Sequence, residues 1–523
     1  MKQTNKKVIK NQKSFEETLW DSANKLRGSV EPSEYKHIVL SLIFLKFVSD
    51  LFETQKQKII DNHGEKYVDI EAFYHKDNTF YLPETSRWSY IIANAKQDDI
   101  ALKIDTALHD IEKKNKSLAG ALPDNYFTRL DLENSDLASL LDEINNIETI
   151  DNSHEDVIGR VYEYFLSKFA LKEGKGKGEF YTPKSIVKLI VELIEPYKGR
   201  VYDPCCGSGG MFVQSLEFID KHKGNRKNIS VYGQEQTTAT YKLAKMNLAI
   251  RGISANLGLP KNTFTQDQHA DEKFDYIMAN PPFNQKDWRA SDELTDDPRW
   301  NGYDTPPTSN ANYGWILHMV SKLSQNGVAG FILSNGALSG DGTEKAIRKQ
   351  LIENHLVEAI IILPRNMFYT TDISVTLWIL NRNKTARTVE YDDTTRHYRN
   401  REQEVLFMDL RQIGEPFEKK YIQFSQEHIQ AIAKTFHSWQ QENSDYQDIA
   451  EYCYSANIDE IKAKDYSLVP SKYIEFINRD ENINFDEKMT ALQSELSQLF
   501  KQEQQSKQEL LKVFDELGFR IDV

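Results

Sequence analysis

The sequence predicts an α/β protein in which a doubly wound sheet follows a helical domain and precedes a C-terminal helix. Three patterns lead to this prediction. Residues 15–151 carry apolar side chains at the three- and four-residue spacing of helices. Between residues 151 and 470, short apolar runs alternate with amphipathic stretches, as strands buried on both faces alternate with helices. From residue 489 onward, apolar residues follow one heptad frame.

The length of 523 residues is too great for one ordinary hydrophobic core, so we expect two or three domains. The changes in pattern along the chain give their boundaries. We predict a helical N-terminal domain at residues 1–150, an α/β domain at residues 151–475 and a C-terminal helical segment for subunit assembly at residues 476–523.

The charge and the cysteine content limit the classes of function. The formal net charge is −14 and the pI is about 5.5, whereas proteins that hold a duplex unaided usually have a basic face or a pI above about 9. A partner is therefore expected to supply much of the contact with any nucleic acid. Three cysteines without a C-x-x-C pair predict a reduced, cytoplasmic chain that has neither a disulfide framework nor a structural metal.

The N-terminal region contains two helical patterns. The stretch "FEETLWDSANKLRG" (15–28) ends at a glycine, and residues 38–52 follow with a strongly apolar pattern. The run "IVLSLIFLKFV" (38–48) is too short to cross a bilayer. We therefore interpret it as a buried core helix and expect no membrane partner.

The stretch "VYDPCCGSGGMF" (201–212) predicts a ligand-binding turn. Asp203 ends a strand, and Gly207, Gly209 and Gly210 follow before a helix begins. Glycines let the backbone approach a ligand closely, and the helix N-terminus offers free N–H groups. A nicotinamide site would have a third glycine at the position of Phe212. The acidic strand end instead favours a cationic ligand, S-adenosylmethionine.

Two further segments are candidates for the same cofactor site. The next strand pattern, "ISVYGQE", ends at Glu235, where a carboxylate can accept hydrogen bonds from both hydroxyls of a ribose. Upstream, "KGKGEFYTPKSIVKLI" joins a glycine–lysine loop to a helix that Pro183 opens. This upstream stretch is either a linker that leads into a helix or a cover over the cofactor.

The tetrapeptide "NPPF" (280–283) follows the strand pattern "FDYIMA" and predicts a site for a planar amine. An exocyclic amine on a heteroaromatic ring is a poor nucleophile because its lone pair is conjugated. The side-chain oxygen of Asn280 and the main-chain oxygen of Pro281 can each accept one N–H, and these bonds strengthen as positive charge develops. The two prolines, Pro281 and Pro282, fix those oxygens, and Phe283 can stack on the ring. We predict that these residues are the catalytic ones.

The next segment, residues 284–315, is long and polar and contains Trp288, Trp300, Tyr303 and Tyr313. Long loops without secondary structure inside compact domains are usually functional or mobile. We predict that this segment closes over a flipped base, because chemistry on a paired base requires its extrusion from the stack. An ordinary surface loop is the alternative.

The C-terminal heptad contains two interruptions. Its frame consists mainly of apolar residues, but Glu503 and Ser506 occupy it in the middle. A self-sufficient coiled coil is therefore disfavoured. Two interpretations stay open: a terminal helix packed on its own domain, and a helix that docks a partner.

Taken in this order, "GEFYTP", "DPCCGSGG" and "NPPF" resemble the adenine-N6 DNA methyltransferases, and most closely the modification subunit of type I restriction–modification systems. The likeness extends to "LWDSANKLRG…EYKHIVLSLIFLKFVSD", which resembles that family's helical N-terminal domain, and to "ILPRNMFYTTDISVTLWILNR", which resembles its distal sheet motif. It implies a Rossmann-like, S-adenosylmethionine-dependent enzyme. Such an enzyme methylates N6 of a flipped adenine at a specific site in double-stranded DNA and so protects host DNA from restriction.

The resemblance also implies site residues and partners. The adenine would be held by residues 280–283, and the cofactor by Glu179, Phe180, Tyr181, Thr182, Pro183, Lys184, Asp203, Gly207, Ser208, Gly209, Gly210, Glu235 and Asn262. Asn262 stands where the family often has an aspartate, and Cys205 and Cys206 stand where it often has small or threonine-like residues. The partners would be a sequence-specificity subunit that carries two such chains and an ATP-driven restriction subunit.

Three other functions are alternatives at this point. Protein glutamine methyltransferases also use an Asn-Pro-Pro-aromatic loop, but theirs usually ends in tyrosine. A non-catalytic assembly subunit would be expected to have lost the motifs, and Phe212 disfavours a nicotinamide oxidoreductase. His154, His269 and His318 lack the spacing of metal ligands, so we expect them at surface or core positions.

Overall fold

The computed structural model describes residues 20, 32–77, 79–130, 132–146, 163–169, 181–222, 224–369, 371–391, 394–417, 420–477 and 485–516. The chain divides into two units, Met1–Ile474 and Glu475–Val523, and each is described by itself. The predicted helix at residues 15–28 lies outside the described residues except for Trp20.

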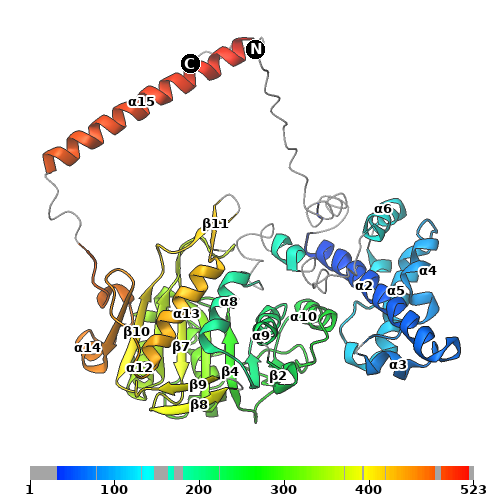
Figure 1. Cartoon of the computed structure of the whole chain (residues 1–523), viewed down its shortest axis with the longest axis horizontal. Helices are drawn as coiled ribbons and strands as arrows, with labels where there is room; N and C mark the ends of the chain where they lie inside the picture. The colour runs from blue at the N-terminus through cyan, green and yellow to red at the C-terminus, as the bar shows by residue number, and fades with distance from the viewer. Residues whose placement is uncertain are drawn as a thin grey trace. The chain divides into compact units, whose positions relative to one another are not determined.

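The N-terminal part of the first unit is helical, as the spacing of its apolar residues predicts (Figure 1). Its elements are α2 (Pro32–His63), η2 (Glu65–Tyr67), α3 (Glu71–Lys76), η3 (Glu84–Ser86), α4 (Trp88–Ala93), α5 (Ile100–Lys114), η4 (Lys116–Leu118), η5 (Phe127–Arg129) and α6 (Asn134–Asn145). Ile38, Leu45 and Phe52 of α2 are fully buried, which confirms the predicted core helix. Among the described residues, no helix has the length and apolar character needed to cross a membrane.

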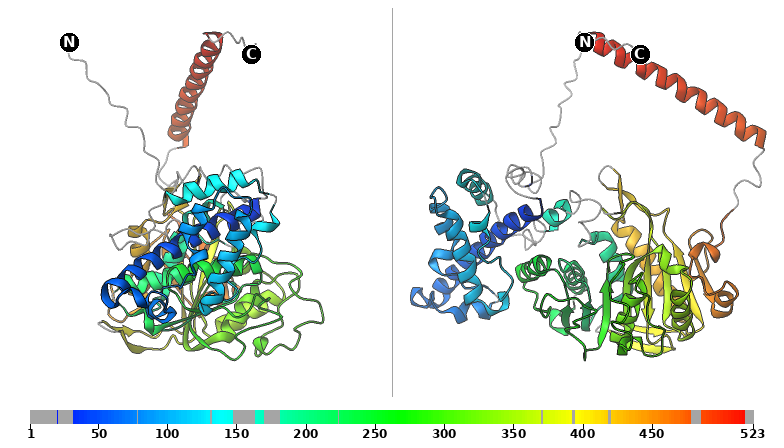
Figure 2. Two further views of the ribbon diagram at one scale, coloured as in Figure 1. Left: turned by 90° about the vertical axis from the view of Figure 1, so that its right-hand side faces the viewer. Right: turned by 180° about the vertical axis from the view of Figure 1, so that it is seen from behind.

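The described residues after 181 build a nine-stranded sheet in the order β13-β10-β6-β7-β5-β4-β1-β2-β3 (Figure 1, Figure 2). Its strands are β1 (Gly199–Asp203), β2 (Ile229–Gly233), β3 (Ala255–Asn256), β4 (Phe274–Ala279), β5 (Leu323–Ser334), β6 (Val357–Ile362), β7 (Val375–Asn381), β10 (Glu404–Asp409) and β13 (Cys453–Asn457). β7 is antiparallel to β5 and β6, and β13 is antiparallel to β10, whereas the other pairs are parallel. Strands thus form where the apolar runs predict them.

Two layers of helices cover the sheet, so alternate side chains of a strand enter different cores. In β7, Leu377 and Ile379 join one cluster of buried residues, and Trp378 and Leu380 join another. The first cluster includes residues of α8 (Lys184–Ile194), α9 (Gly210–Lys221), α10 (Thr238–Ile250) and α13 (Gln426–Gln440), and the second includes residues of α11 (Asn312–Lys322), α12 (Thr343–Glu353) and α14 (Ile458–Ala463). This double cover is the doubly wound arrangement that the sequence predicts.

The remaining elements of the first unit are small. They are the hairpins β8 (Arg387–Tyr391)–β9 (Thr394–Tyr398) and β11 (Glu415–Phe417)–β12 (Tyr421–Gln423), and the turns η6 (Arg226–Asn228), η7 (Pro298–Trp300), η8 (Asn335–Leu338) and η9 (Pro470–Lys472). Helix α10 joins the sheet region to the helical region. Its Leu243 and Met246 belong to the helical core, and its Lys242 Nζ donates to the carbonyl of Leu122 over 2.8 Å.

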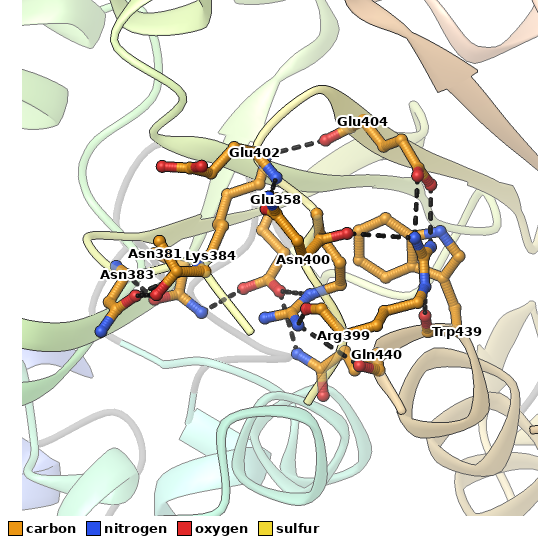
Figure 3. A network of polar contacts seen from close by, with 12 residues as sticks. Glu358, Asn381, Asn383, Lys384, Arg399, Asn400, Glu402, Glu404, Trp439 and Gln440 are labelled. Carbon is orange, nitrogen blue, oxygen red and sulfur yellow. Dashed lines mark hydrogen bonds and ion pairs between the residues drawn. The ribbon is translucent and has the colours of Figure 1, made fainter. Parts of the chain in front are cut away.

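A buried network of polar side chains ties β6 and β7 to α13 (Figure 3). Glu358 of β6 pairs with Arg401 over 2.9 Å, and both side chains are fully buried. Asn381 and Gln440 each donate a further hydrogen bond to the Glu358 carboxylate. Lys384 donates to two main-chain carbonyls, each over 2.7 Å. Because the buried carboxylate has several donors, its charge is compensated inside the core.

The second unit contains α15 (Phe485–Glu516), a single long helix. The helix confirms that the C-terminal heptad is helical over the described residues, whereas Leu517 of the frame lies outside them. Its exposed apolar residues are Met489, Leu492, Leu496, Leu499, Phe500, Leu510 and Val513.

Candidate active site

A cavity of about 290 Å³ lies at the carboxyl ends of β1, β2 and β4. Strand order reverses here: from β1 the chain continues to β2 and β3 on one side, and from β4 it continues to β5 on the other side. Open α/β sheets bind ligands at such a switch point. The lining residues are Glu163, Leu166, Tyr181, Thr182, Lys184, Val187, Asp203, Pro204, Cys205, Cys206, Gly207, Ser208, Gly210, Met211, Gln214, Glu235, Gln236, Thr237, Asn247, Asn262, Thr263, Phe264, Asn280, Pro282, Gln285 and Trp315.

The glycine turn forms one wall of this cavity, between β1 and α9. Gly207 and Gly209 have φ angles of 53° and 78°, the left-handed region that glycine enters without strain. Gly209 precedes α9 and does not line the cavity, whereas Gly207, Ser208 and Gly210 do. Asn247 donates to the carbonyl of Ser208 over 2.7 Å and so holds the turn against α10.

Two buried carboxylates face this turn. Asp203 ends β1, is 2% exposed and accepts the N–H of Cys205 over 3.0 Å. Glu235 follows β2, is 5% exposed and accepts the N–H groups of Gly207 and Thr237. Burial raises the pKa of Asp203 to about 7, and the nearby Glu235 adds to this rise. Burial likewise raises the pKa of Glu235. A cation in the cavity would relieve both effects.

Asn262 lines the cavity, and its side chain also builds the turn in which it lies. Its Oδ1 accepts the N–H groups of Phe264 over 2.8 Å and Thr265 over 3.3 Å, and its Nδ2 donates to Gln236. The geometry therefore shows how Asn262 holds the turn. Its predicted role in holding the cofactor stays a prediction.

The upstream segment is described from Tyr181 onward, so Glu179 and Phe180 lie outside the described residues. Tyr181, Thr182 and Lys184 line the cavity, and Pro183 does not. Pro183 immediately precedes α8 and acts as its N-cap, so the proline stands at the helix start as predicted. The Nζ of Lys184 lies 2.9 Å from Glu163 and 3.5 Å from Glu217, which balance its charge.

Asn280 follows the last residue of β4 and brings an unused acceptor to the cavity. Its Nδ2 donates to the hydroxyl of Thr182 over 3.1 Å, while its buried Oδ1 has no hydrogen-bond partner. Pro282 also lines the cavity, whereas Pro281 and Phe283 do not. The ring of Phe283 packs edge to face on Phe368, with centroids 5.9 Å apart.

Three further lining residues, which were not predicted from the sequence, also have a buried polar atom without a hydrogen-bond partner. Gln214 Oε1, Gln285 Oε1 and Trp315 Nε1 are buried without a hydrogen-bond partner. Buried polar atoms in native proteins are rarely left unpaired, because each costs free energy. A ligand with donors and an acceptor at these positions would satisfy them. Trp315 carried a weak signal as an aromatic residue at the end of the polar segment, and neither glutamine carried one.

The polar segment 284–315 is more ordered than its composition predicts. It contains η7 and the first residues of α11, and Trp288, Trp300 and Tyr313 are buried. Residues 284–311 contain no α-helix or strand and so form a long loop, as predicted, but the loop is ordered because its aromatic side chains pack around Phe264. Trp288 lies 4.4 Å from the Phe264 ring and 6.2 Å from the Trp300 ring, measured between centroids. Closure of the segment over a base stays a prediction.

The histidines occupy core positions where they are described. His269 and His318 are buried, which confirms the expectation for both, and His154 lies outside the described residues. Burial lowers the pKa of His318 to about 3, so its ring is neutral near pH 7. In the part of the chain that the structure describes, no group of His, Cys, Asp or Glu side chains is arranged to hold a metal ion.

Comparisons with known families agree with this geometry. Residues 153–482 match the family model described as N-6 DNA Methylase, and residues 15–144 match that of the HsdM N-terminal domain. The chain is 41% identical to the type I restriction enzyme HindI methylase subunit of Haemophilus influenzae, over 84% of this chain and 100% of that protein. It is 34% identical to the MjaIX methylase subunit of Methanocaldococcus jannaschii, over 97% of this chain and 92% of that protein.

A solved structure shows a similar fold. The type I restriction–modification methyltransferase subunit from Streptococcus thermophilus superposes with a TM-score of 0.72 at 24% identity, over 88% of this chain and 99% of that one. A chain from a study of complex assembly in a type I system superposes with a TM-score of 0.60 at 17% identity, over 96% of this chain and 99% of that one.

Proposed function

Because this chain belongs to the N-6 DNA methylases and, among them, to the methylase subunits of type I restriction enzymes, we propose that its cavity binds S-adenosylmethionine beside the residues that hold the target adenine. Family membership supports an adenine-N6 DNA methyltransferase over a protein glutamine methyltransferase or a non-catalytic subunit. The proposed reaction transfers a methyl group to N6 of a flipped adenine within a specific DNA sequence.

The buried carboxylates supply the cofactor side of this proposal. S-adenosylmethionine carries an activated methyl group on a sulfonium sulfur and adds an ammonium group and a ribose. Glu235 is proposed to accept the ribose hydroxyls, and Asp203 to attract the positive charge from the floor of the glycine turn. Gly207 and Gly210 let the backbone approach the ligand, while Tyr181, Thr182, Lys184 and Asn262 line the rest of the cavity.

Residues 280–283 are proposed to form the base side. Thr182 holds the amide nitrogen of Asn280, so the unpartnered Oδ1 is available to accept one N6 proton. The main-chain oxygen of Pro281 would accept the other. As the nitrogen attacks the methyl group it gains positive charge, and both oxygens stabilise that charge. Phe283, braced by Phe368, would stack on the adenine ring.

One observation carries the proposal. The unpartnered Oδ1 of Asn280 shares a single cavity with the two buried carboxylates Asp203 and Glu235. An acceptor for an amine and an electronegative pocket for a cation are therefore adjacent, as methyl transfer to an exocyclic amine requires.

Two substitutions test the separate roles of Asn280 in holding the target base and of Glu235 in binding the cofactor. We expect Asn280→Ala to keep S-adenosylmethionine binding but to abolish methyl transfer, because the amide faces the base. We expect Glu235→Ala to weaken cofactor binding by on the order of 1.5–3 kcal/mol, because the ribose loses a charged acceptor. Calorimetric titration measures the binding of S-adenosylmethionine. Incorporation of labelled methyl groups into DNA by the assembled complex measures methyl transfer.

Asn301→Ala, which truncates an exposed asparagine of the following segment, is the control and should change neither property. Reduced cofactor affinity with unchanged transfer in Asn280→Ala would contradict the proposed role of the amide. An unchanged binding constant in Glu235→Ala would remove Glu235 from the cofactor site. Methylation-sensitive sequencing of host DNA with and without the gene would identify the target sequence.

We also infer the partners that the activity requires. As a methylase subunit, the chain is proposed to act on double-stranded DNA with a sequence-specificity subunit that carries two such chains, and with a restriction subunit for cleavage. The net charge of −14 supports this, because an acidic chain gains little from release of the counterions of DNA. The exposed apolar residues of α15 are the proposed docking surface for the specificity subunit. A cytoplasmic location stays a prediction.

A further inference from the structure

Arg299 lies in η7, in the segment that follows residues 280–283. Each N–H group of its side chain donates a hydrogen bond. Its guanidinium has five N–H groups, and five acceptors surround it. Nε and Nη2 donate to the two carboxylate oxygens of Asp297, over 2.7 and 2.6 Å. Nη1 donates to the carbonyl of Thr263 and to His318 Nδ1, and Nη2 donates to the carbonyl of Phe264 over 2.6 Å. The side chain is 9% exposed.

The two carbonyls belong to the turn of Asn262, which lines the cavity. Thr263 and Phe264 line it as well, and the hydroxyl of Thr263 donates to the carbonyl of Pro204 next to Asp203. The ring of Phe264 lies 4.3 Å from that of Trp315, another lining residue. Arg299 therefore joins a cavity-lining turn to the segment that continues directly from the target-base residues.

Arg289 provides a contrast within the same segment. Its Nη1 and Nη2 donate to the carbonyls of Ala290, Ser291, Glu293 and Pro306, all of which lie in residues 284–315. Arg289 thus holds the segment together internally, whereas Arg299 crosses to a different part of the chain. Substitution of Arg289 therefore perturbs contacts within the segment, whereas substitution of Arg299 perturbs the contacts between the segment and the cavity.

We propose that Arg299 is a positioning residue that couples cofactor binding to the segment beside the target base. The inference rests on the proposed function of the cavity. When a ligand fixes the turn at residues 262–264, the guanidinium fork transmits that order to η7, and order in the segment in turn favours the ligand. A lysine cannot replace the fork, because an ammonium group has three donors and no planar geometry.

Binding and hydrogen exchange of the full-length chain test the coupling. In the wild type, S-adenosylmethionine is expected to slow exchange in residues 261–266 and in residues 284–311. In Arg299→Lys, we expect the dissociation constant to rise by about fivefold or more, the lower end of typical coupling between two sites. At saturating cofactor, protection of residues 261–266 should remain while the added protection of residues 284–311 is lost. Arg289→Lys, the matched control, should keep wild-type affinity and wild-type protection by cofactor.

Each result has a defined meaning. Added protection of residues 284–311 in saturated Arg299→Lys equal to that of the wild type would overturn the coupling, whatever the affinity. An unchanged dissociation constant would overturn it as well. Failure of the wild type to bind S-adenosylmethionine would instead reject the proposed function of the cavity. If Arg299→Lys does not fold, Asp297→Asn takes its place, since it weakens the anchor of the guanidinium and should give a smaller change in the same direction.

Discussion

Asp203 and Glu235 are an unfavourable pair in the absence of a cation. Both carboxylates are nearly inaccessible to solvent, burial raises the pKa of each, and the neighbouring Glu235 adds to the rise in the pKa of Asp203. The N–H groups of Cys205, Gly207 and Thr237 offset part of this cost. A residue pair of this kind is poised to bind positive charge, because the ligand removes an unfavourable interaction as well as adding a favourable one.

The pKa of Asp203, raised by burial to about 7, predicts a pH-dependent affinity. Below that pH the carboxyl is protonated in the free chain, and the proton must leave before the carboxylate can attract the cofactor. S-adenosylmethionine affinity should therefore rise with pH, with a slope of at most about tenfold per pH unit, and level off above pH 7. Calorimetric titrations across this range measure the slope.

Asp203→Asn should bind more weakly at high pH and lose the slope, since its amide does not titrate. Glu272→Gln removes a half-exposed carboxylate near the amino end of β4, away from the cavity at the carboxyl ends of the strands. It should keep the wild-type dependence of affinity on pH. A wild-type affinity that stays flat through pH 7 would contradict the role given to Asp203.

Among the elements, β6 and β7 depend on a buried charge that has no contact with the cavity. Glu358 lies in a strand that is otherwise apolar, and its carboxylate is held by Arg401, Asn381 and Gln440 (Figure 3). Coulombic attraction from Arg401 helps to keep the pKa of Glu358 low against the opposing effect of burial. The network fixes α13 and the loop before β10 on the sheet.

We expect Arg401→Met to lower the free energy of unfolding by about 3–5 kcal/mol, because the buried carboxylate of Glu358 loses its charged partner. Denaturant titration measures this change. The double variant that adds Glu358→Gln should be less destabilised than Arg401→Met, because it removes the buried carboxylate together with its charged partner. Lys462→Met, which breaks an exposed pair with Asp459, should change stability by less than about 1 kcal/mol. Equal effects of the buried and exposed substitutions would contradict this account.

At the scale of the whole molecule, we propose that the chain binds DNA through assembly with a partner rather than by itself. The chain carries 79 acidic and 65 basic residues, and an acidic chain gains little from release of the counterions of DNA. The exposed apolar residues of α15 are interrupted by Glu503 and Ser506, which discourages pairing between identical helices. These features favour a different partner over a second copy of the chain.

Removal of residues 485–523 should abolish co-purification with the specificity subunit and leave S-adenosylmethionine binding unchanged. Leu496→Glu should weaken the complex in the same way, because it places a charge on the apolar seam. Gln498→Glu adds the same charge away from the seam and is the matched control. The full-length chain alone should methylate DNA barely or not at all. Survival of the complex after truncation, or full activity of the isolated chain, would contradict the assembly proposal.

The sequence by itself determined the fold class and the motifs of the cavity. Apolar runs such as "VTLWILN" predict strands buried on both faces, and the residues that end neighbouring parallel strands meet at one edge of the sheet. Asp203, Glu235 and Asn280 were therefore predictable as neighbours. The direction of β7 was not, because a strand buried on both faces has the same composition whether it runs parallel or antiparallel.

Only the tertiary structure decided which further side chains reach the cavity and what holds them. Gln214, Gln285 and Trp315 line it because of helix and loop orientations that no local pattern records. The burial of Trp288 and Trp300 depends on packing around Phe264, so composition alone predicted an irregular loop. The acceptors of Arg299 include main-chain carbonyls, and every residue has one. Such a contact has no sequence signature, because its specificity lies in position rather than in residue type.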